Sequence, residues 1–344
     1  MENIVKQRKN KYTATEVFTF LILLFFIVLI ALNPAKYSMA SFKGLEVWAK
    51  ILVPSLLPFF ILTKLFASSG IIYDISNLFA PATKKLFKCP PITAYIFFMS
   101  VITGYPVGSK LIADMYNNKN IDKYEAQRAL AFCSNSGPMF ILGSVAVGMF
   151  GNKKIGIIIL ISHIIGSILN GIIYRNTGKN HTKKQKNEEK MQKNTHLDFN
   201  FSKNVFDSVS SILLIGGVIC FCFVIIEAIT SNTFFINMFS RFGKNANIFS
   251  SLFCGLFEIT KGCLMLSECS LPICTIVPLL TFIISFGGIS TMLQAMAFTN
   301  KIITIKKFCL IKFTHAIFSL FFCLLILFVF KFCYSLWNIS ILTK

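Results

Sequence analysis

The sequence predicts an all-α, polytopic integral membrane protein with roughly 8 to 10 membrane helices in two pseudo-repeated halves. Composition is the first observation: 55% of the 344 residues are hydrophobic, only 14% are charged, and 38 are Phe. A soluble core does not need so much apolar surface. The second observation is the length of the apolar runs, because about 20 apolar residues cross a bilayer as one helix. Runs near this length lie at 17–32, 48–66, 155–173, 212–229 and 308–330.

The third observation is a set of shorter or interrupted apolar runs between the long ones, at 92–102, 138–150 and 272–298. Glycine, proline and small polar residues interrupt the chain beside these runs. Backbone that leaves the helix inside a membrane must be satisfied by protein or by water in a cavity. We therefore expect broken or re-entrant helical hairpins that line a pathway instead of facing lipid.

Residues 1–40 are predicted to form a basic N-terminal tail and the first membrane helix. Lysine and arginine precede the first apolar run, and membrane proteins keep such residues on the cytoplasmic side. The run is long for the core of a signal peptide, and Asn33 and Pro34 follow it without a small-residue cleavage site. We expect an uncleaved span.

Residues 41–175 are predicted to form the first membrane half. Its first span contains Pro54 and Pro58, and proline inside a helix removes a backbone hydrogen bond and bends the helix. Two breaks follow, with the sequences GYPVGSK at 104–110 and SNSGP at 134–138. Both place polar side chains within otherwise apolar sequence, which makes them the first candidates for a binding site.

Residues 176–205 are rich in Lys, Asn and Gln and almost free of apolar side chains. Such a composition cannot bury a core. We expect a basic cytoplasmic linker here, followed by a second membrane half over residues 206–344.

The second half repeats features of the first at an offset of 151 residues. This offset pairs Ser109 with Thr260 as well as the glycines, lysines and serines of the breaks. Interrupted segments at corresponding places in two halves are a sequence indicator of a transporter site. The pairs are Gly104 with Gly255, Lys110 with Lys261, Ser134 with Ser285, and Gly137 with Gly288.

Three charged residues at the breaks have more than one interpretation. Lys110 and Lys261 are costly deep in a membrane, and they either line the cavity and attract an anion or extend to the interface. Glu258 either carries a coupling proton, since burial favours the neutral acid, or neutralises Lys261, which lies three residues away on the same helical face.

Small polar residues at the breaks offer hydrogen bonds to a solute without a permanent charge, although helix capping also explains some of them. Tyr105 either closes the pocket or is an ordinary interfacial aromatic. The complete set of predicted solute-binding residues is Tyr105, Lys110, Ser134, Asn135, Ser136, Gly137, Glu258, Thr260, Lys261, Ser290, Thr291 and Gln294.

Several function classes are disfavoured. The formal charge of +20 lies mainly in the tail and loops, which disfavours nucleic acid as a partner. The 11 Cys are scattered through apolar sequence, so we expect reduced, buried thiols. We expect His163 and His315 to hydrogen-bond to neighbouring helices and not to bind a metal. Hydrolase, metalloprotease and Walker motifs are missing from the sequence, so we expect no enzyme, metal or cofactor. A coupling ion, H⁺ or Na⁺, is left open.

Four segments carry a family resemblance: PSLLPFFIL at 54–62, TGYPVGSK at 103–110, CSNSGPMFILG at 133–143 and GLFEITKG at 255–262. With them, the chain from about residue 40 onward closely resembles the YlbJ (SpoVV) family of sporulation integral membrane proteins. That family belongs to the wider nucleoside-recognition, or Gate-domain, group, which is similar to concentrative nucleoside transporters.

The resemblance implies a spore-forming bacterium and a protein of the cell membrane or outer forespore membrane that moves dipicolinate. Two lysines and two helix N-termini suit the two carboxylates of this flat dianion. A nucleoside or related carrier is the alternative, and a structural role in spore-envelope assembly is the second alternative. The expected partners are dipicolinate and the lipid bilayer, and a homo-oligomer is left open.

Overall fold

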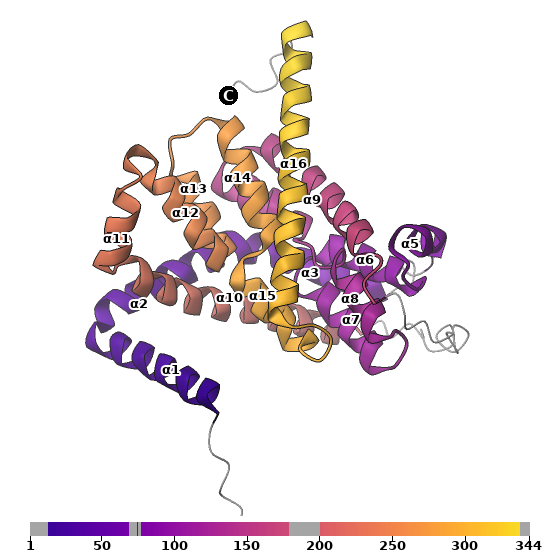
Figure 1. The fold of residues 1–344 in the computed structure, drawn as a ribbon, viewed down its shortest axis with the longest axis horizontal. Coiled ribbons are helices and arrows are strands. Elements are labelled where there is room, and N and C mark those ends of the chain that lie inside the picture. Colours follow the sequence, from indigo (N-terminus) through magenta and orange to yellow (C-terminus); the bar gives the residue numbers. More distant parts are fainter. Residues whose placement is uncertain (1–12, 69–73, 75–76, 179–199, 338–344) are drawn as a thin grey trace, which may run out of the picture.

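The computed structural model describes residues 13–68, 74, 77–178 and 200–337, and these residues form helices joined by loops, without a strand (Figure 1). The helices up to the linker are α1 (Ala14–Leu32), α2 (Pro34–Val47), the π-helical η2 (Trp48–Leu52), α3 (Val53–Ser68), α5 (Ala80–Phe87), α6 (Ile92–Thr103), α7 (Val107–Asn117), α8 (Lys123–Leu130), the π-helical η3 (Met139–Met149) and α9 (Lys153–Tyr174).

The helices after the linker are α10 (Phe201–Thr230), α11 (Thr233–Ser240), the 3₁₀ turn η4 (Gly243–Asn245), α12 (Ala246–Phe257), α13 (Ile259–Ser267), α14 (Ile273–Phe286), α15 (Gly288–Thr299) and α16 (Ile305–Trp337). Most of the predicted basic linker, residues 179–199, and the tail residues 1–12 lie outside the described residues.

Within the described residues, five helices are long and apolar enough to cross a membrane, or six if α5 and α6, bent by 95°, count as one span. The predicted all-α polytopic class is confirmed. The number of full spans is smaller than the expected 8 to 10, because the breaks divide much of the apolar sequence into helices too short to cross alone. The five are Pro34–Leu65, Lys153–Tyr174, Phe201–Thr230, Ile273–Thr299 and Ile305–Val329.

The helix order is the same in the two halves, since α6, α7, α8, η3 and α9 are followed later in the chain by α12, α13, α14, α15 and α16. The offset is close to the expected one: α9 begins at Lys153 and α16 at Ile305, 152 residues later. Contacts between the halves follow the same correspondence. α7 packs against α15, α13 packs against η3, and α9 packs along its counterpart α16.

The centre of the molecule is the contact of α9, α14 and α16, with the long α16 in yellow (Figure 1). Its buried apolar side chains include Ile159, Leu280 and Cys323. Close packing of α9 on α16 requires a glycine, because a Cβ atom at Gly166 would overlap Ser319. A second layer contains α10 packed against α2 and α3, and Trp48 Nε1 donates a hydrogen bond to the Ile212 carbonyl oxygen at 2.9 Å.

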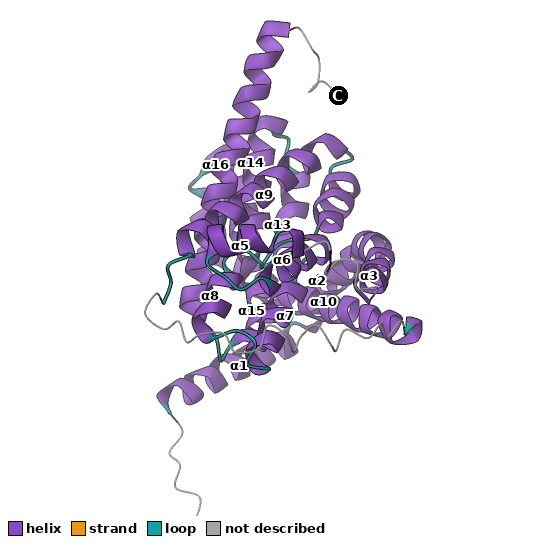
Figure 2. Ribbon diagram, turned by 90° about the vertical axis from the view of Figure 1, so that its right-hand side faces the viewer, coloured by secondary structure: helices purple, strands orange, loops and turns teal. Residues whose placement is uncertain are grey.

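Large apolar side chains are also exposed on the outside of several helices. They occur along α1, which extends away from the other helices and contacts α2 (Figures 1 and 2), and on the outer faces of α10 and α16. Examples are Phe18, Phe20, Leu213, Phe321 and Phe328. Apolar surface of this extent on spanning helices is typical of contact with lipid tails, and the predicted multi-pass integral membrane location is confirmed.

Gly104 sits where α6 ends, with φ 79° and ψ −164°, a conformation that is essentially restricted to glycine. A Cβ atom there would also lie 2.5 Å from the backbone nitrogen of Gly137. We predict that Gly104→Ala lowers the free energy of unfolding by on the order of 1–3 kcal/mol. The measurement is thermal unfolding of the detergent-solubilised protein followed by intrinsic fluorescence.

The matched control is Gly217→Ala in α10, where a Cβ atom would meet no atom within 4 Å. Alanine is the better helix former, so this variant should be at least as stable as the wild type. Equal melting temperatures for the two variants would contradict the importance of the Gly104 conformation.

Candidate functional site

Four helix breaks lie in the buried interior of the fold. Residues 104–106 separate α6 from α7, and the non-helical residues 134–137 precede η3. In the second half, Glu258 separates α12 from α13, and Gly287 separates α14 from α15. A new helix starts directly after each break, so each break brings a helix N-terminus into the interior.

The breaks contact one another. The first meets the second at Gly104 and Gly137, as described above, and a Cβ atom at Gly287 would lie 3.2 Å from Tyr105 Oη, which joins the first break to the fourth. Behind the fourth break, a Cβ atom at Gly288 would lie 3.1 Å from the Phe257 carbonyl oxygen of the third. The four breaks of the two halves therefore meet at one place.

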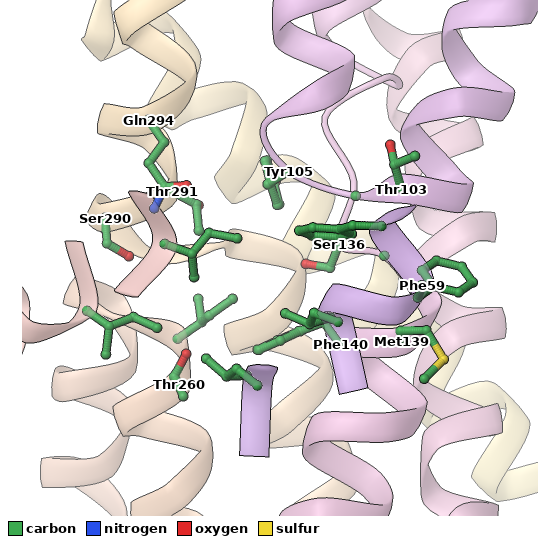
Figure 3. A pocket seen from close by; sticks show the side chains of 18 of the residues that line it. Phe59, Thr103, Tyr105, Ser136, Met139, Phe140, Thr260, Ser290, Thr291 and Gln294 are labelled. Atoms are coloured by element: carbon green, nitrogen blue, oxygen red, sulfur yellow. The ribbon is translucent and has the colours of Figure 1, made fainter. Parts of the chain in front are cut away.

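A pocket with an empty volume of about 620 Å³, including the space at its mouth, lies where the breaks meet (Figure 3). One wall is apolar and comes mainly from η2, α3 and α10, with Leu52, Leu56, Phe59, Phe60, Ile215 and Ile219. Polar side chains come from both halves: the first half contributes Thr103, Tyr105 and Ser136, and the second half contributes Glu258, Thr260, Ser290, Thr291 and Gln294.

Eight of the twelve residues predicted from the sequence line this pocket: Tyr105, Ser136, Gly137, Glu258, Thr260, Ser290, Thr291 and Gln294. The other four, Lys110, Ser134, Asn135 and Lys261, are absent from its lining. The residues come from distant parts of the sequence, and the breaks bring them together.

The expectation that Lys110 and Lys261 line the cavity requires a correction. The Lys110 side chain is exposed. Lys261 faces α10, with Nζ 4.0 Å from Glu227 Oε2 and 5.0 Å from the centroid of the Phe223 ring. The rotation of α7 and α13 about their axes places both lysines away from the pocket.

The position of Glu258 does not agree with one of its two interpretations, the neutralisation of Lys261. The pairing partner of the Lys261 ammonium is Glu227, whereas the Glu258 carboxylate, which is 2% exposed, caps α13. Its Oε2 atom accepts a hydrogen bond from the backbone N–H of Lys261 at 2.7 Å. The positive end of the helix dipole therefore stabilises this carboxylate at the edge of the pocket.

Ser134 and Asn135 lie behind the pocket and hold the second break in place. The Ser134 carbonyl oxygen accepts hydrogen bonds from Tyr105 Oη and Lys312 Nζ, both at 2.8 Å. Asn135 Nδ2 donates to the Phe132 carbonyl oxygen at 2.7 Å and to Ser100 Oγ at 3.1 Å. These hydrogen bonds satisfy the carbonyl oxygens of Ser134 and Phe132 and position the loop between α8 and η3.

Lys312 is the residue that the sequence reasoning missed. It is 1% exposed on α16, next to Tyr105 of the pocket wall. The signal was present, because Lys312 is a cation within the long apolar run at 308–330, where a charge is costly.

The expected hydrogen bonds of His163 and His315 to neighbouring segments are observed: the Ser136 N–H donates to His163 Nε2, and His315 Nε2 lies 3.0 Å from the His163 carbonyl oxygen.

Ser290 has a feature that points to a ligand. Its hydroxyl is buried and without a hydrogen-bonding partner among the described residues, and the residue lines the pocket on the first turn of α15 (Figure 3). A buried hydroxyl normally finds a partner. Within the described residues no group of three or more His, Cys, Asp or Glu side chains could hold a metal ion. The arrangement suits a small organic solute that forms hydrogen bonds.

Removal of the Glu258 cap should destabilise the protein. We predict that Glu258→Ala lowers the free energy of unfolding by about 1 kcal/mol, because the N-terminus of α13 loses its side-chain acceptor. Glu258→Gln retains an acceptor oxygen and should lose less. Thermal unfolding of both variants tests this, and a Gln variant as unstable as the Ala variant would contradict the capping role.

No family model and no solved structure match this chain. It is similar to the sporulation integral membrane protein YlbJ of Bacillus subtilis (strain 168), with 28% identity over 355 aligned positions that cover 93% of this chain and 85% of that protein. The likeness extends through both halves and all four breaks. This similarity supports the resemblance to the YlbJ family of sporulation integral membrane proteins that the four sequence segments indicate.

Proposed function

We propose that this protein is a carrier that moves a small solute, dipicolinate, across a membrane during sporulation. The observation that supports the proposal most directly is the pocket that the four helix breaks of both halves enclose. Carriers commonly bind their solute between two repeats, at discontinuous helices near the midplane. A movement of one half against the other would then open the pocket alternately to the two sides.

The two kinds of pocket wall support a flat solute with polar ends. Phe59 and Phe140 line it among aliphatic side chains and offer contact to an aromatic ring. Ser290 and Gln294 provide a hydroxyl and an amide on α15. The N-termini of η3 and α15 add N–H groups that have no partner inside their helices and favour negative charge.

A nucleoside is the alternative solute, and one observation favours it. The described residues that line the pocket include no Lys or Arg, while Glu258 contributes a carboxylate. Hydroxyl, amide and carboxylate groups around an apolar wall also suit a neutral ring with several donors. We propose dipicolinate first, because it has a direct relation to sporulation and its carboxylates suit the helix N-termini.

The first experiment is uptake of labelled dipicolinate by the purified protein in proteoliposomes. We expect uptake above that of protein-free vesicles, saturation with substrate, and little competition from an excess of nucleosides. Strong competition by nucleosides would indicate that the solute is a nucleoside and not dipicolinate. Absence of uptake for both classes of solute would contradict a carrier function.

A second prediction uses two buried serines whose hydroxyls have no partner among the described residues: Ser290, which lines the pocket, and Ser319, which does not. Because no protein hydrogen bond is lost, both alanine variants should keep their thermal stability. Ser290→Ala should weaken dipicolinate binding about tenfold or more, the effect of one hydrogen bond to a charged group. Equal affinities of the two variants, measured by calorimetry, would remove Ser290 from the site.

A further inference from the structure

A cluster of three basic side chains is buried in the helical core, next to the pocket. Lys312 and His315 come from α16 and His163 from α9, and each is at most 1% exposed. The two imidazole rings lie 4.7 Å apart between centroids. His163 and His315 are 152 residues apart, as are the starts of their helices, so they occupy equivalent places in the two halves.

Lys312 has no counterpart in the other half, because the position 152 residues earlier is Leu160. An aliphatic side chain therefore fits at the equivalent place in the fold. Packing alone does not require a lysine on α16, and a buried lysine is costly in a membrane. The difference between the two halves therefore indicates that the charge of Lys312, and not its packing, is what this place requires.

The surroundings of Lys312 contain acceptors and an aromatic ring. Its Nζ atom donates to the Ser134 carbonyl oxygen at 2.8 Å, lies 3.1 Å from His315 Nδ1, and lies 5.1 Å from the centroid of the Tyr105 ring. Among the described residues, no carboxylate forms an ion pair with it. A protonated Lys312 thus has a cation–π contact but no negative partner.

The hydrogen bonds define the neutral tautomers of both histidines. A backbone N–H only donates, so His163 Nε2 accepts from Ser136, and its Nδ1–H faces Ser285 Oγ at 2.8 Å. A carbonyl only accepts, so His315 Nε2–H donates to the His163 carbonyl oxygen, and its Nδ1 accepts from Lys312. A second proton on either ring would break one of these hydrogen bonds.

Lys312 differs from the histidines in this respect. As an amine it has two N–H groups, which suffice for the Ser134 carbonyl oxygen and His315 Nδ1. As an ammonium it keeps both hydrogen bonds and gains a third N–H, which can face the Tyr105 ring. The cluster can therefore gain or lose one proton at Lys312 without any change of hydrogen-bonding partner.

We propose that Lys312 is a proton-binding site linked to the pocket, and that an anion entering the pocket is accompanied by uptake of one proton from water by the Lys312 amine. This inference rests on the proposed function. Tyr105 connects the two sites, because it lines the pocket, faces Lys312 with its ring, and shares the Ser134 carbonyl oxygen with it. An anion supplies the negative partner that Lys312 lacks, so each binding event favours the other.

The groups that face Lys312 from its neighbours are Tyr105, His163 and His315; the helices α14 and α15, which also pack on α16, present no charged side chain to it. The other titratable group of the pocket is Glu258. Proton uptake by Glu258 is the competing explanation, so the experiment must separate the two.

The test is isothermal calorimetry of dipicolinate binding to the full-length protein in lipid nanodiscs. Two buffers with different ionisation enthalpies report the number of protons taken up. Dipicolinate remains a dianion at neutral and alkaline pH, so a change in proton number belongs to the protein. We expect the wild type to take up about one proton per bound dipicolinate. In the pH range where Lys312 changes charge, the affinity for dipicolinate should fall by up to about tenfold for each unit by which the pH rises.

Lys312→Met should bind dipicolinate without proton uptake, and Lys312→Gln, whose amide can still donate to Ser134, is the second variant in case the first does not fold. Lys306→Met, an exposed lysine on the same helix, is the control and should keep the uptake. Glu258→Gln alters a pocket residue and can change the affinity, but the number of protons taken up per bound dipicolinate should stay at about one. Binding by the wild type without proton uptake, or uptake lost in Glu258→Gln and kept in Lys312→Met, overturns the inference alone. No binding by the wild type overturns the proposed function together with it.

Discussion

Backbone that leaves the helix inside a membrane must find its hydrogen bonds within the protein or in enclosed water, and this constraint organises the whole interior of the structure. The second break shows how it is met. Tyr105 and Lys312 donate to the Ser134 carbonyl oxygen, His163 accepts from the Ser136 N–H, and the Ser136 hydroxyl donates to the Ile284 carbonyl oxygen. The buried polar side chains of α9 and α16 are thus required by the same breaks that create the pocket.

The same constraint explains why the pocket belongs to both halves. Side chains of one half bond to the other half beside the breaks: Lys312 on α16 donates to the Ser134 carbonyl oxygen of the second break, and His163 on α9 contacts the Ser285 hydroxyl near the end of α14. These reciprocal contacts couple the halves around the place where a solute would bind. Binding of a solute in the pocket would therefore affect the hydrogen bonds that hold α9 and α16 together.

The sequence predicted the class of fold, the positions of the breaks and most of the pocket, because glycine, proline and small polar residues stand out in apolar sequence. Side-chain direction could not be predicted, since it depends on the rotation of each short helix about its axis. Lys110 and Lys261 lie in the first turn of short helices just after a break, yet one is exposed and the other faces Glu227. Lys312 was missed because its partners Ser134 and Tyr105 are about two hundred residues earlier in the chain.

The most direct test of a solute site formed by the helix breaks is a cryo-electron microscopy structure of the protein in lipid nanodiscs with dipicolinate. Density for the ligand should lie between the apolar wall of α3 and α10 and the polar side chains of α15, within hydrogen-bonding distance of Ser290. A saturated complex in which this pocket is empty and the ligand binds elsewhere would contradict the account.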